Sequence, residues 1–137
     1  MTYVLFDIGG TKTRVAISED LTVFTDVESF KTPVSFADGV EKVWTAVEKL
    51  TDKPITAIAG GLRGLLNEQK TGIQNDSILT KWVGKDLVAA LQKKADVPVF
   101  LENDTAIAGV GEAVFGAGRG LEIVAYHTVS TGVGGVK

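Results

Sequence analysis

The sequence DIGGTKT, residues 7–13, ends an apolar run with an acid, two glycines, a threonine and a lysine, and the fold can be worked out from this turn. The run before it, YVLFDI, predicts a buried strand, and RVAIS after it predicts a second strand. LTVFTDVESF continues the pattern. The chain is therefore predicted to begin as a meander of three antiparallel strands.

The turn in this meander has the composition of a phosphate-binding loop. A Gly-Gly turn lets the backbone adopt left-handed angles and direct its N–H groups toward an anion. Asp7, at the end of the strand, can hold Mg²⁺ directly or through water. The predicted phosphate-binding residues are Gly9, Gly10, Thr11 and Lys12. The alternative is a plain hairpin turn in which Asp7 is only a turn acid.

Helical and strand-like segments alternate in the rest of the chain. Residues 35–50 carry apolar side chains at helical spacing, and Ser35 with Asp38 predicts the helix start. After this helix we predict a strand over 55–60, an irregular surface excursion up to Trp82, a helix over 84–96, a strand over 97–103 and a helix over roughly 105–115. A meander extended by parallel crossovers gives an α/β fold with a five-stranded mixed sheet and helices on both faces. This is the layout of a ribonuclease-H-like, or actin-like ATPase, domain.

The stretch FLENDTAIAGVGE, residues 100–112, brings three polar side chains together where a strand meets a helix. These are Glu102, Asn103 and Asp104. Asn and Asp are common helix caps, so capping alone is one interpretation. One cap is enough for a helix, however, whereas three polar groups offer a general base, an amide for a hydroxyl and a supporting acid. We favour a chemical role for this stretch.

A second glycine-rich turn follows later in the chain. LEIVAYHTVS, residues 121–130, predicts a further strand, and STGVGG after it again places hydroxyls and glycines behind a strand. Two turns of this kind predict a polyphosphate between them. Neither GxxxxGK[ST] nor GxGxxG occurs, so the sequence supports neither a P-loop nor a dinucleotide-binding unit.

Composition excludes several classes of function. The 137 residues are 45% hydrophobic and 23% charged, as in an ordinary globular protein. A net charge of -3 without a basic cluster argues against nucleic acid as a partner. The chain has no cysteine and one histidine, which excludes a disulfide framework and a thiolate metal site. With neither a signal peptide nor a run long enough to span a membrane, the sequence predicts a soluble, cytoplasmic protein with no membrane partner.

DIGGTKTRVA, ENDTAIAGVGE, GAGRG and VSTGVGG, in this order and spacing, resemble the ROK family of sugar kinases within the actin/hexokinase superfamily. The resemblance spans nearly the whole chain. It implies an ATP-dependent hexose kinase, similar to a glucokinase, that transfers the γ-phosphate of ATP to a sugar hydroxyl with the help of Mg²⁺. The implied partners are ATP and a small sugar.

The resemblance also implies roles for individual residues. Asp104 matches the family's catalytic base, and Asn103 would hydrogen-bond the sugar. Asn75 is a looser match to a sugar-contacting asparagine. The first phosphate motif falls on the turn after Asp7, with Asp7 near Mg²⁺. The second phosphate motif falls on Thr131, Gly132, Gly134 and Gly135.

The chain departs from the family pattern at several positions. Ser130 and Val136 stand where the family commonly has glycine, and a β-branched valine does not readily adopt glycine's backbone angles. A usual Pro-Gly-Pro turn is replaced by Arg63-Gly64-Leu65, and Ala106 replaces a usual asparagine. These departures leave the choice of sugar open.

Length is the larger departure, since ROK kinases have two similar domains around a cleft. We expect residues 1–118 to form the first domain and residues 119–137 to supply the first strand and phosphate turn of a second, otherwise missing, domain. The family's zinc motif and most of its adenine pocket belong to that missing half. We therefore expect no zinc site in this chain and an incomplete kinase site.

Two alternatives remain at this point. A non-catalytic half-domain could associate with itself as a homodimer, because the predicted strand over 121–130 has no partner in the chain. A ROK repressor would carry a helix-turn-helix before the first strand, and we expect no room for one before Tyr3. His127, alone in a predicted strand, is expected to be a half-buried or edge residue rather than a site residue.

Overall fold

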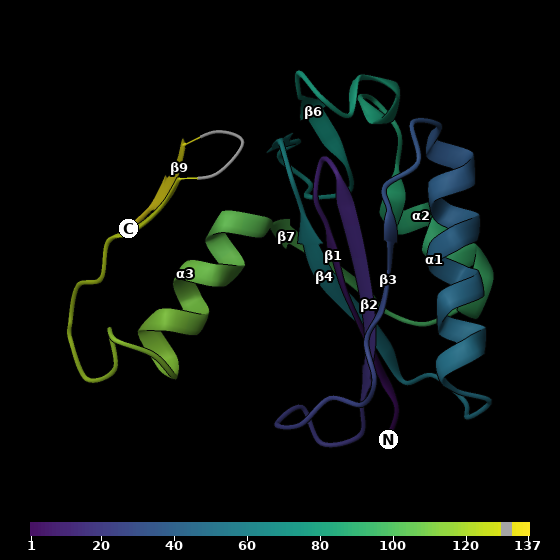
Figure 1. Cartoon of the computed structure of the whole chain (residues 1–137), viewed down its shortest axis with the longest axis horizontal. Helices are drawn as coiled ribbons and strands as arrows, with labels where there is room; N and C mark the ends of the chain where they lie inside the picture. The colour runs from purple at the N-terminus through teal and green to yellow at the C-terminus, as the bar shows by residue number, and fades with distance from the viewer. Residues whose placement is uncertain (130–132) are drawn as a thin grey trace.

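A five-stranded mixed sheet forms the centre of the computed structural model, which describes residues 1–129 and 133–137 (Figure 1). The strand order is β3-β2-β1-β4-β7. The pairs β1–β2 and β2–β3 are antiparallel, and the pairs β1–β4 and β4–β7 are parallel. The strands are β1 (Tyr3–Ile8), β2 (Lys12–Ser18), β3 (Glu28–Lys31), β4 (Ala57–Leu62) and β7 (Val99–Asn103). The predicted meander with parallel crossovers is confirmed.

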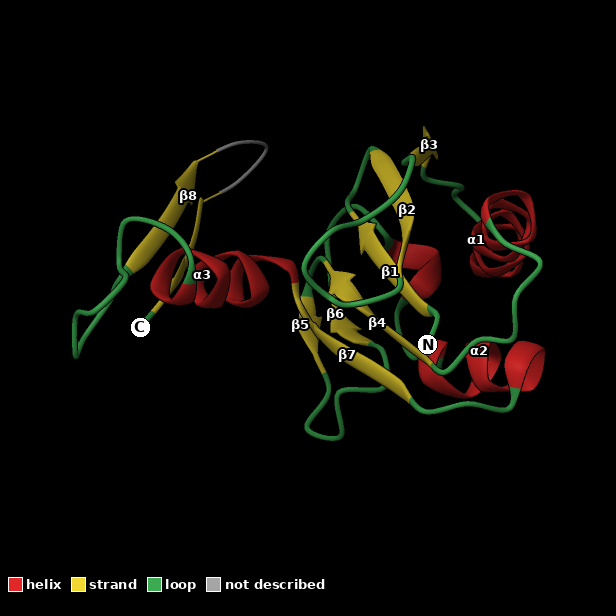
Figure 2. Cartoon of the chain, turned by 90° about the horizontal axis from the view of Figure 1, so that it is seen from below, coloured by secondary structure: helices red, strands yellow, loops and turns green. Residues whose placement is uncertain are grey.

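Two helices cover one face of this sheet, and a third begins over the other face (Figures 1 and 2). They are α1 (Phe36–Leu50), α2 (Leu87–Ala95) and α3 (Asp104–Val114). Side chains of β1 alternate between the faces, and Val4, Phe6 and Ile8 pack with the apolar stripes of α1 and α2. The prediction of helices on both faces is confirmed.

The helices begin at side chains that accept a hydrogen bond from the first turn. Ser35 Oγ accepts from Asp38 N at 3.4 Å, which confirms the predicted start of α1. Asp86 Oδ1 accepts from Ala89 N at 2.8 Å and caps α2. Because short helices gain little from propensity alone, these caps and the apolar stripes together fix α1 and α2 on the sheet.

The segment after β4 is more ordered than the predicted surface excursion. It contains β5 (Leu65–Leu66), β6 (Ile73–Asn75) and the 3₁₀ turn η1 (Thr80–Trp82). Trp82 is buried, donates from Nε1 to Pro33 O at 3.1 Å and packs edge-on against Phe36 with the ring centres 5.3 Å apart. Apolar anchors such as Trp82 therefore fold the segment onto the sheet, and sequence patterning missed them because they are spaced irregularly.

The last part of the chain forms a separate arm (Figure 2). α3 runs away from the end of β7 and carries the hairpin of β8 (Tyr126–Val129) and β9 (Val133–Val136). We call the described residues of 104–137 the C-terminal arm and residues 1–103 the sheet body. The prediction of one unpaired strand over 121–130 is wrong, because Tyr126–Val129 pairs antiparallel with Val133–Val136. An unpaired strand no longer favours a dimer.

Among the described residues, no helix has the length and apolar character that crossing a lipid bilayer requires.

Candidate active site

A hollow of about 440 Å³ lies where the sheet body meets the C-terminal arm. The parallel strands β1, β4 and β7 end in register here, since Ile8 pairs with Leu62 and Leu62 pairs with Asn103. From the sheet body the lining residues are Asp7, Gly9, Gly10, Thr11, Lys12, Arg14, Arg63, Gly64 and Asn103. From the arm they are Asp104, Thr105, Thr128, Val133 and Gly134. The carboxyl ends of parallel strands are where open α/β sheets bind ligands.

The glycine turn after β1 is a tight hairpin whose glycines are needed for space. Gly9 N donates to Lys12 O at 2.9 Å, and Thr32, the residue after β3, fixes the turn by donating from Oγ1 to Gly9 O at 2.8 Å. Neither Gly9 nor Gly10 has a positive φ, so the expected left-handed angles are wrong. A Cβ at Gly10 would instead lie 2.7 Å from Arg63 Nη1.

Asp7 lies at the rim of the hollow and is paired with a cation. Its Oδ2 accepts from Arg14 Nη1 at 3.0 Å, and both side chains are largely exposed. No group of three or more possible metal-ligating side chains occurs among the described residues. Mg²⁺, however, commonly takes one or two carboxylates and fills its other positions with water and phosphate oxygens. The carboxylate of Asp7 beside the glycine turn fits that pattern.

Asn103 caps α3, and Asp104 does not. Asn103 Oδ1 accepts from Thr105 N at 3.0 Å and from Ala106 N at 3.2 Å. Asp104 is the first helical residue, and its half-buried carboxylate lines the hollow with a hydrogen bond from Thr105 N at 2.8 Å to Oδ1. Since capping is performed by its neighbour, it does not account for the acid at position 104.

The start of α3 rests directly on the sheet. A Cβ at Gly61 of β4 would lie 3.2 Å from the Cα of Asp104, tighter than ordinary packing. Asn103 Nδ2 also donates to Gly64 O at 2.9 Å, which ties the loop after β4 to the same point. The Asn103 amide therefore has one N–H left to offer a ligand.

Glu102, the third polar residue of this stretch, is not part of the hollow's lining. Its carboxylate accepts from Lys70 Nζ and from Asn103 N, the latter at 2.9 Å. The hydrogen bond from Lys70 holds the pKa of Glu102 below its usual value. Glu102 thus supports the chain around Asn103 as an ionised acid.

The second predicted phosphate turn lies partly outside the described residues, which do not include Thr131 and Gly132. Gly134 lines the hollow and lies close to Thr105, where a Cβ would come within 2.6 Å of Oγ1. Gly135 is outside the lining and faces His127, which is exposed. Val136 has no positive φ and packs over Gly109, so the expected conflict with glycine angles does not arise.

Asn75 lies away from the hollow. It ends β6 with an exposed side chain and is absent from the lining. Its backbone oxygen would lie 3.2 Å from a Cβ at Gly64, whose φ is +97°. The backbone of Asn75 thus packs against the loop after β4, and the side chain is not brought to the hollow with Asn103 and Asp104.

Six lining residues were not predicted as site residues: Arg14, Arg63, Gly64, Thr105, Thr128 and Val133. Arg14 was recoverable, because a hairpin turn at 9–12 makes it the cross-strand partner of Asp7. Arg63 follows β4 directly, where strand-end residues collect. Thr105 follows Asp104 in the chain and reaches the hollow with it. Thr128 carries no local signal, because the packing of the β8–β9 hairpin against α3 brings it to the hollow.

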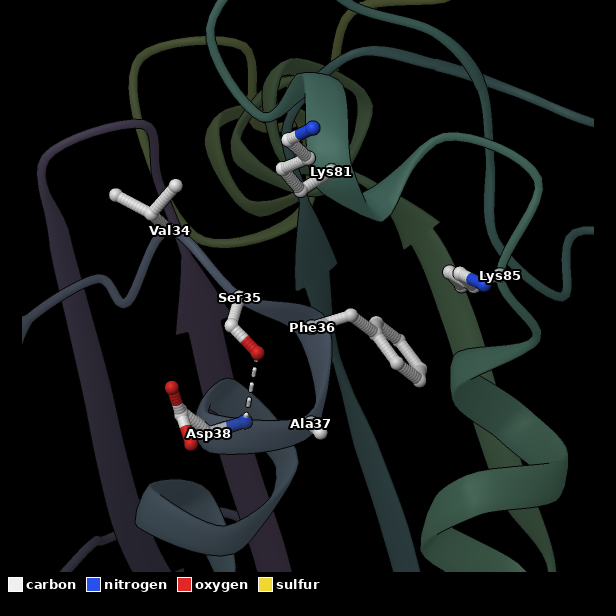
Figure 3. A pocket seen from close by; sticks show the side chains of 7 residues that line it. All are labelled: Val34, Ser35, Phe36, Ala37, Asp38, Lys81 and Lys85. Carbon is white, nitrogen blue, oxygen red and sulfur yellow. Dashed lines mark hydrogen bonds between the residues drawn. The ribbon is translucent and has the colours of Figure 1, made fainter.

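A larger hollow of about 750 Å³ lies at the start of α1 and contains none of the predicted site residues (Figure 3). Its polar groups include Lys81, Lys85 and the capping Ser35. The Ser35 hydroxyl is already bonded to Asp38 N. Size alone therefore does not identify the site, whereas the hollow at the strand ends collects eight of the predicted residues: Asp7, Gly9, Gly10, Thr11, Lys12, Asn103, Asp104 and Gly134.

Comparisons with known proteins agree with this architecture. A glucokinase of Streptomyces coelicolor is 29% identical over 130 residues, covering 94% of this chain and 41% of the relative. The structure of a ROK family glucokinase from Streptomyces griseus, in complex with glucose and AMPPNP, superimposes with a TM-score of 0.87 at 26% identity, covering 98% of this chain and 43% of that one. A ROK hexokinase from Thermus thermophilus superimposes with a TM-score of 0.78 at 30% identity, covering 98% and 46%.

This chain spans less than half the length of these relatives. The sequence pattern described as "ROK family" matches residues 3–136, nearly all of the chain. With the five-stranded sheet and the strand-end hollow, this match shows that the chain belongs to the ROK family.

Proposed function

We propose that this chain is the N-terminal part of an ATP-dependent sugar kinase, similar to a glucokinase, that transfers the γ-phosphate of ATP to a sugar hydroxyl. One observation carries the proposal. The carboxylate of Asp104, which is not the helix cap, shares a hollow with the glycine turn after β1. Phosphoryl transfer to a hydroxyl needs at least a proton acceptor and, beside it, groups that bind the phosphates. The relatives named glucokinase support the choice of a hexose.

The residues of the hollow divide the work between the two substrates. Asp104 accepts the proton of the sugar hydroxyl as its oxygen attacks phosphorus, and Asn103 offers its remaining N–H to the sugar. The turn residues Gly9–Lys12 face the phosphates of ATP. Asp7 would hold Mg²⁺ through water, and the ion supplies charge neutralisation on the phosphate oxygens.

We assign to the second glycine turn a role in holding the same phosphates from the opposite side. Gly134 contributes backbone at the lining. We also assign Thr131, Gly132 and Gly135, which match the family's second phosphate motif, to contacts with these phosphates. The C-terminal arm then faces the β1–β2 turn across the hollow, and ATP would lie between them.

Equilibrium binding to this chain tests the proposal. Nuclear magnetic resonance titrations with glucose and with Mg·AMPPNP should shift the amide signals of Gly10, Asn103 and Asp104. The same spectra should show little change at α1, which lies on the other face of the sheet. Binding that shifts only residues outside the hollow would contradict the proposal.

Turnover provides the chemical test. In any assay with measurable glucose-dependent ADP formation, Asp104→Asn should lower kcat by about 10² to 10⁴, the usual contribution of a general base. Asp52→Asn removes an exposed acid far from the hollow and is the matched control. Full activity of Asp104→Asn would exclude Asp104 as the base.

A further inference from the structure

Arg63 stands between the two halves of the candidate site. It follows β4 directly, and its backbone N donates to Ile8 O at 3.0 Å, so it continues the pairing of β4 with β1. The next residue, Gly64, accepts a hydrogen bond from the Asn103 amide at 2.9 Å. The backbone around Arg63 is thus fixed to the strand before the glycine turn and to the cap of α3.

A buried carboxylate orients the guanidinium of Arg63. Its Nε lies 3.2 Å from Asp76 Oδ1 and 3.1 Å from Oδ2, and the Asp76 side chain is only 4% exposed. Leu79 N donates to Asp76 Oδ2 at 2.7 Å and holds the carboxylate in place. Burial alone would raise the pKa of Asp76, but the hydrogen bonds from Leu79 and Arg63 outweigh it and lower the pKa. Asp76 is therefore ionised and positions the cation.

The free end of the guanidinium points at the glycine turn. The ion pair uses Nε, which leaves the N–H groups of Nη1 and Nη2 for other acceptors. Nη1 would lie 2.7 Å from a Cβ at Gly10, so the side chain packs directly on that residue. Arg63 and Asp104 both line the same hollow. A pre-oriented cation therefore faces the space between the phosphate turn and the proposed base.

We propose that Arg63 binds the phosphoryl group that is transferred, and that it is a catalytic residue of this site. The inference rests on the proposed kinase function. Three cations line the hollow. Lys12 belongs to the glycine turn and Arg14 is paired with Asp7, whereas Arg63 is anchored through Nε and holds Nη1 against Gly10. A planar fork of N–H donors matches the oxygens of a phosphoryl group.

The step balances without a covalent change at Arg63. The sugar oxygen forms a bond to the γ-phosphorus, and its proton goes to the Asp104 carboxylate. The bond between the γ-phosphorus and the β,γ-bridging oxygen breaks, and ADP leaves with that oxygen. Arg63 keeps its charge and offsets the negative charge on the transferred oxygens.

A purely structural role would predict a different result. If Arg63 only anchored the loop after β4 through Asp76, its loss would disturb the whole hollow and weaken all nucleotides alike. Contact with the transferred group instead predicts a loss confined to ligands that carry a γ-phosphate. The comparison of Mg·AMPPNP with Mg·ADP therefore separates the two roles.

Isothermal titration of this chain with both nucleotides is the experiment. We expect Arg63→Gln to bind Mg·AMPPNP about tenfold more weakly than the unchanged chain, the usual effect of one hydrogen bond to a charged group. Binding of Mg·ADP should change by less than about twofold. Arg63→Lys should recover part of the loss, because it keeps the charge without the fork. Arg119→Gln removes the same charge outside the hollow and should match the unchanged chain.

Each other outcome has a definite meaning. Equal weakening of both nucleotides by Arg63→Gln, in a variant with an unchanged unfolding midpoint, overturns the contact and leaves only the structural role. If Arg63→Gln unfolds, Arg63→Lys carries the test, and an unchanged preference for Mg·AMPPNP over Mg·ADP overturns the proposal. If the unchanged chain binds neither nucleotide, the phosphate site at the β1–β2 turn fails for this chain and the role of Arg63 fails with it. The proposed kinase function is tested separately, by turnover and Asp104→Asn.

Discussion

The sheet body and the C-terminal arm contribute equally important groups to the hollow but are stabilised very differently. The body buries a continuous apolar core, in which Val4, Ile8 and Leu91 are completely inaccessible to solvent. In α3 only Gly109 is buried, and Val110 is 62% exposed. The glycine turn after β1 therefore adjoins the well-buried core, whereas Asp104 begins the element with less burial. The comparison shows that a site can be shared between parts of unequal stability.

The largest effect should come from truncating the core of the body. Trp82→Ala removes a side chain that is 2% exposed and hydrogen-bonded to Pro33, and it should lower the free energy of unfolding by about 3–5 kcal/mol. Val110→Ala in the arm should change it by less than about 0.5 kcal/mol. Urea unfolding followed by circular dichroism measures both. Similar losses of stability in the two variants would show that the sheet body and the C-terminal arm are stabilised to the same degree.

The next effect concerns pH and the body's buried ion pair. The pKa of Asp76 is lower folded than unfolded, so its contribution to stability is present above about pH 4 and is lost as the pH falls through the folded pKa. Asp76→Asn should cost about 1–3 kcal/mol at neutral pH and flatten the loss of stability below pH 4. Urea unfolding at a series of pH values measures this, with the exposed Asp52→Asn as control. A variant with the unchanged acid dependence would refute the assignment.

A smaller and more local effect is expected at the joint between the two parts. Asn103→Ala removes both the cap of α3 and the bond to Gly64, and should destabilise α3 by about 1–2 kcal/mol. Asn103→Asp keeps the cap but loses the donor to Gly64. Amide hydrogen exchange should therefore accelerate in α3 for Asn103→Ala while β1 stays protected. Faster exchange throughout β1 would mean that body and arm unfold together.

The smallest effect should come from the exposed pair at the rim. Arg14→Gln breaks the contact with Asp7, and because both side chains face solvent we expect at most about 1 kcal/mol. The difference from the unchanged chain should disappear at high salt. Thermal unfolding at two ionic strengths measures it. A loss as large as that of Asp76→Asn would show that the rim is not solvent-screened.

Local sequence signals predicted those parts of the fold that local physics controls. Apolar periodicity predicted the order of strands and helices. Ser35 with Asp38 predicted the start of α1, where the structure has the capping bond. The prediction also placed Asp104 at the start of α3. It did not identify Asn103 as the cap, since both residues can perform that role.

Features that depend on tertiary packing were missed or misjudged. The residues STGVGG were expected to form a tight turn because hydroxyls and glycines follow a predicted strand, yet Val133–Val136 form β9 through pairing with β8. Gly10 was expected to need unusual backbone angles, but the reason for glycine there is the Arg63 side chain above it. The place of Arg63 after a strand gives its position, but its ion pair could not be predicted locally, because Asp76 lies thirteen residues away in the chain.

The absence of a side chain at Gly61 controls the distance between the start of α3 and the sheet. The missing side chain there sets how closely α3 approaches the sheet, since a Cβ would press on the Cα of Asp104. A larger residue at position 61 would push the start of α3 away from the sheet. This helix is about 16 Å long, at 1.5 Å per residue. The β8–β9 hairpin packs on the start and middle of α3, with Gly134 against Thr105 and Val136 against Gly109. Such a change would therefore displace Asp104 and the hairpin together relative to the β1–β2 turn. A series of substitutions of increasing size at position 61 would therefore vary the distance between α3 and the sheet in small steps.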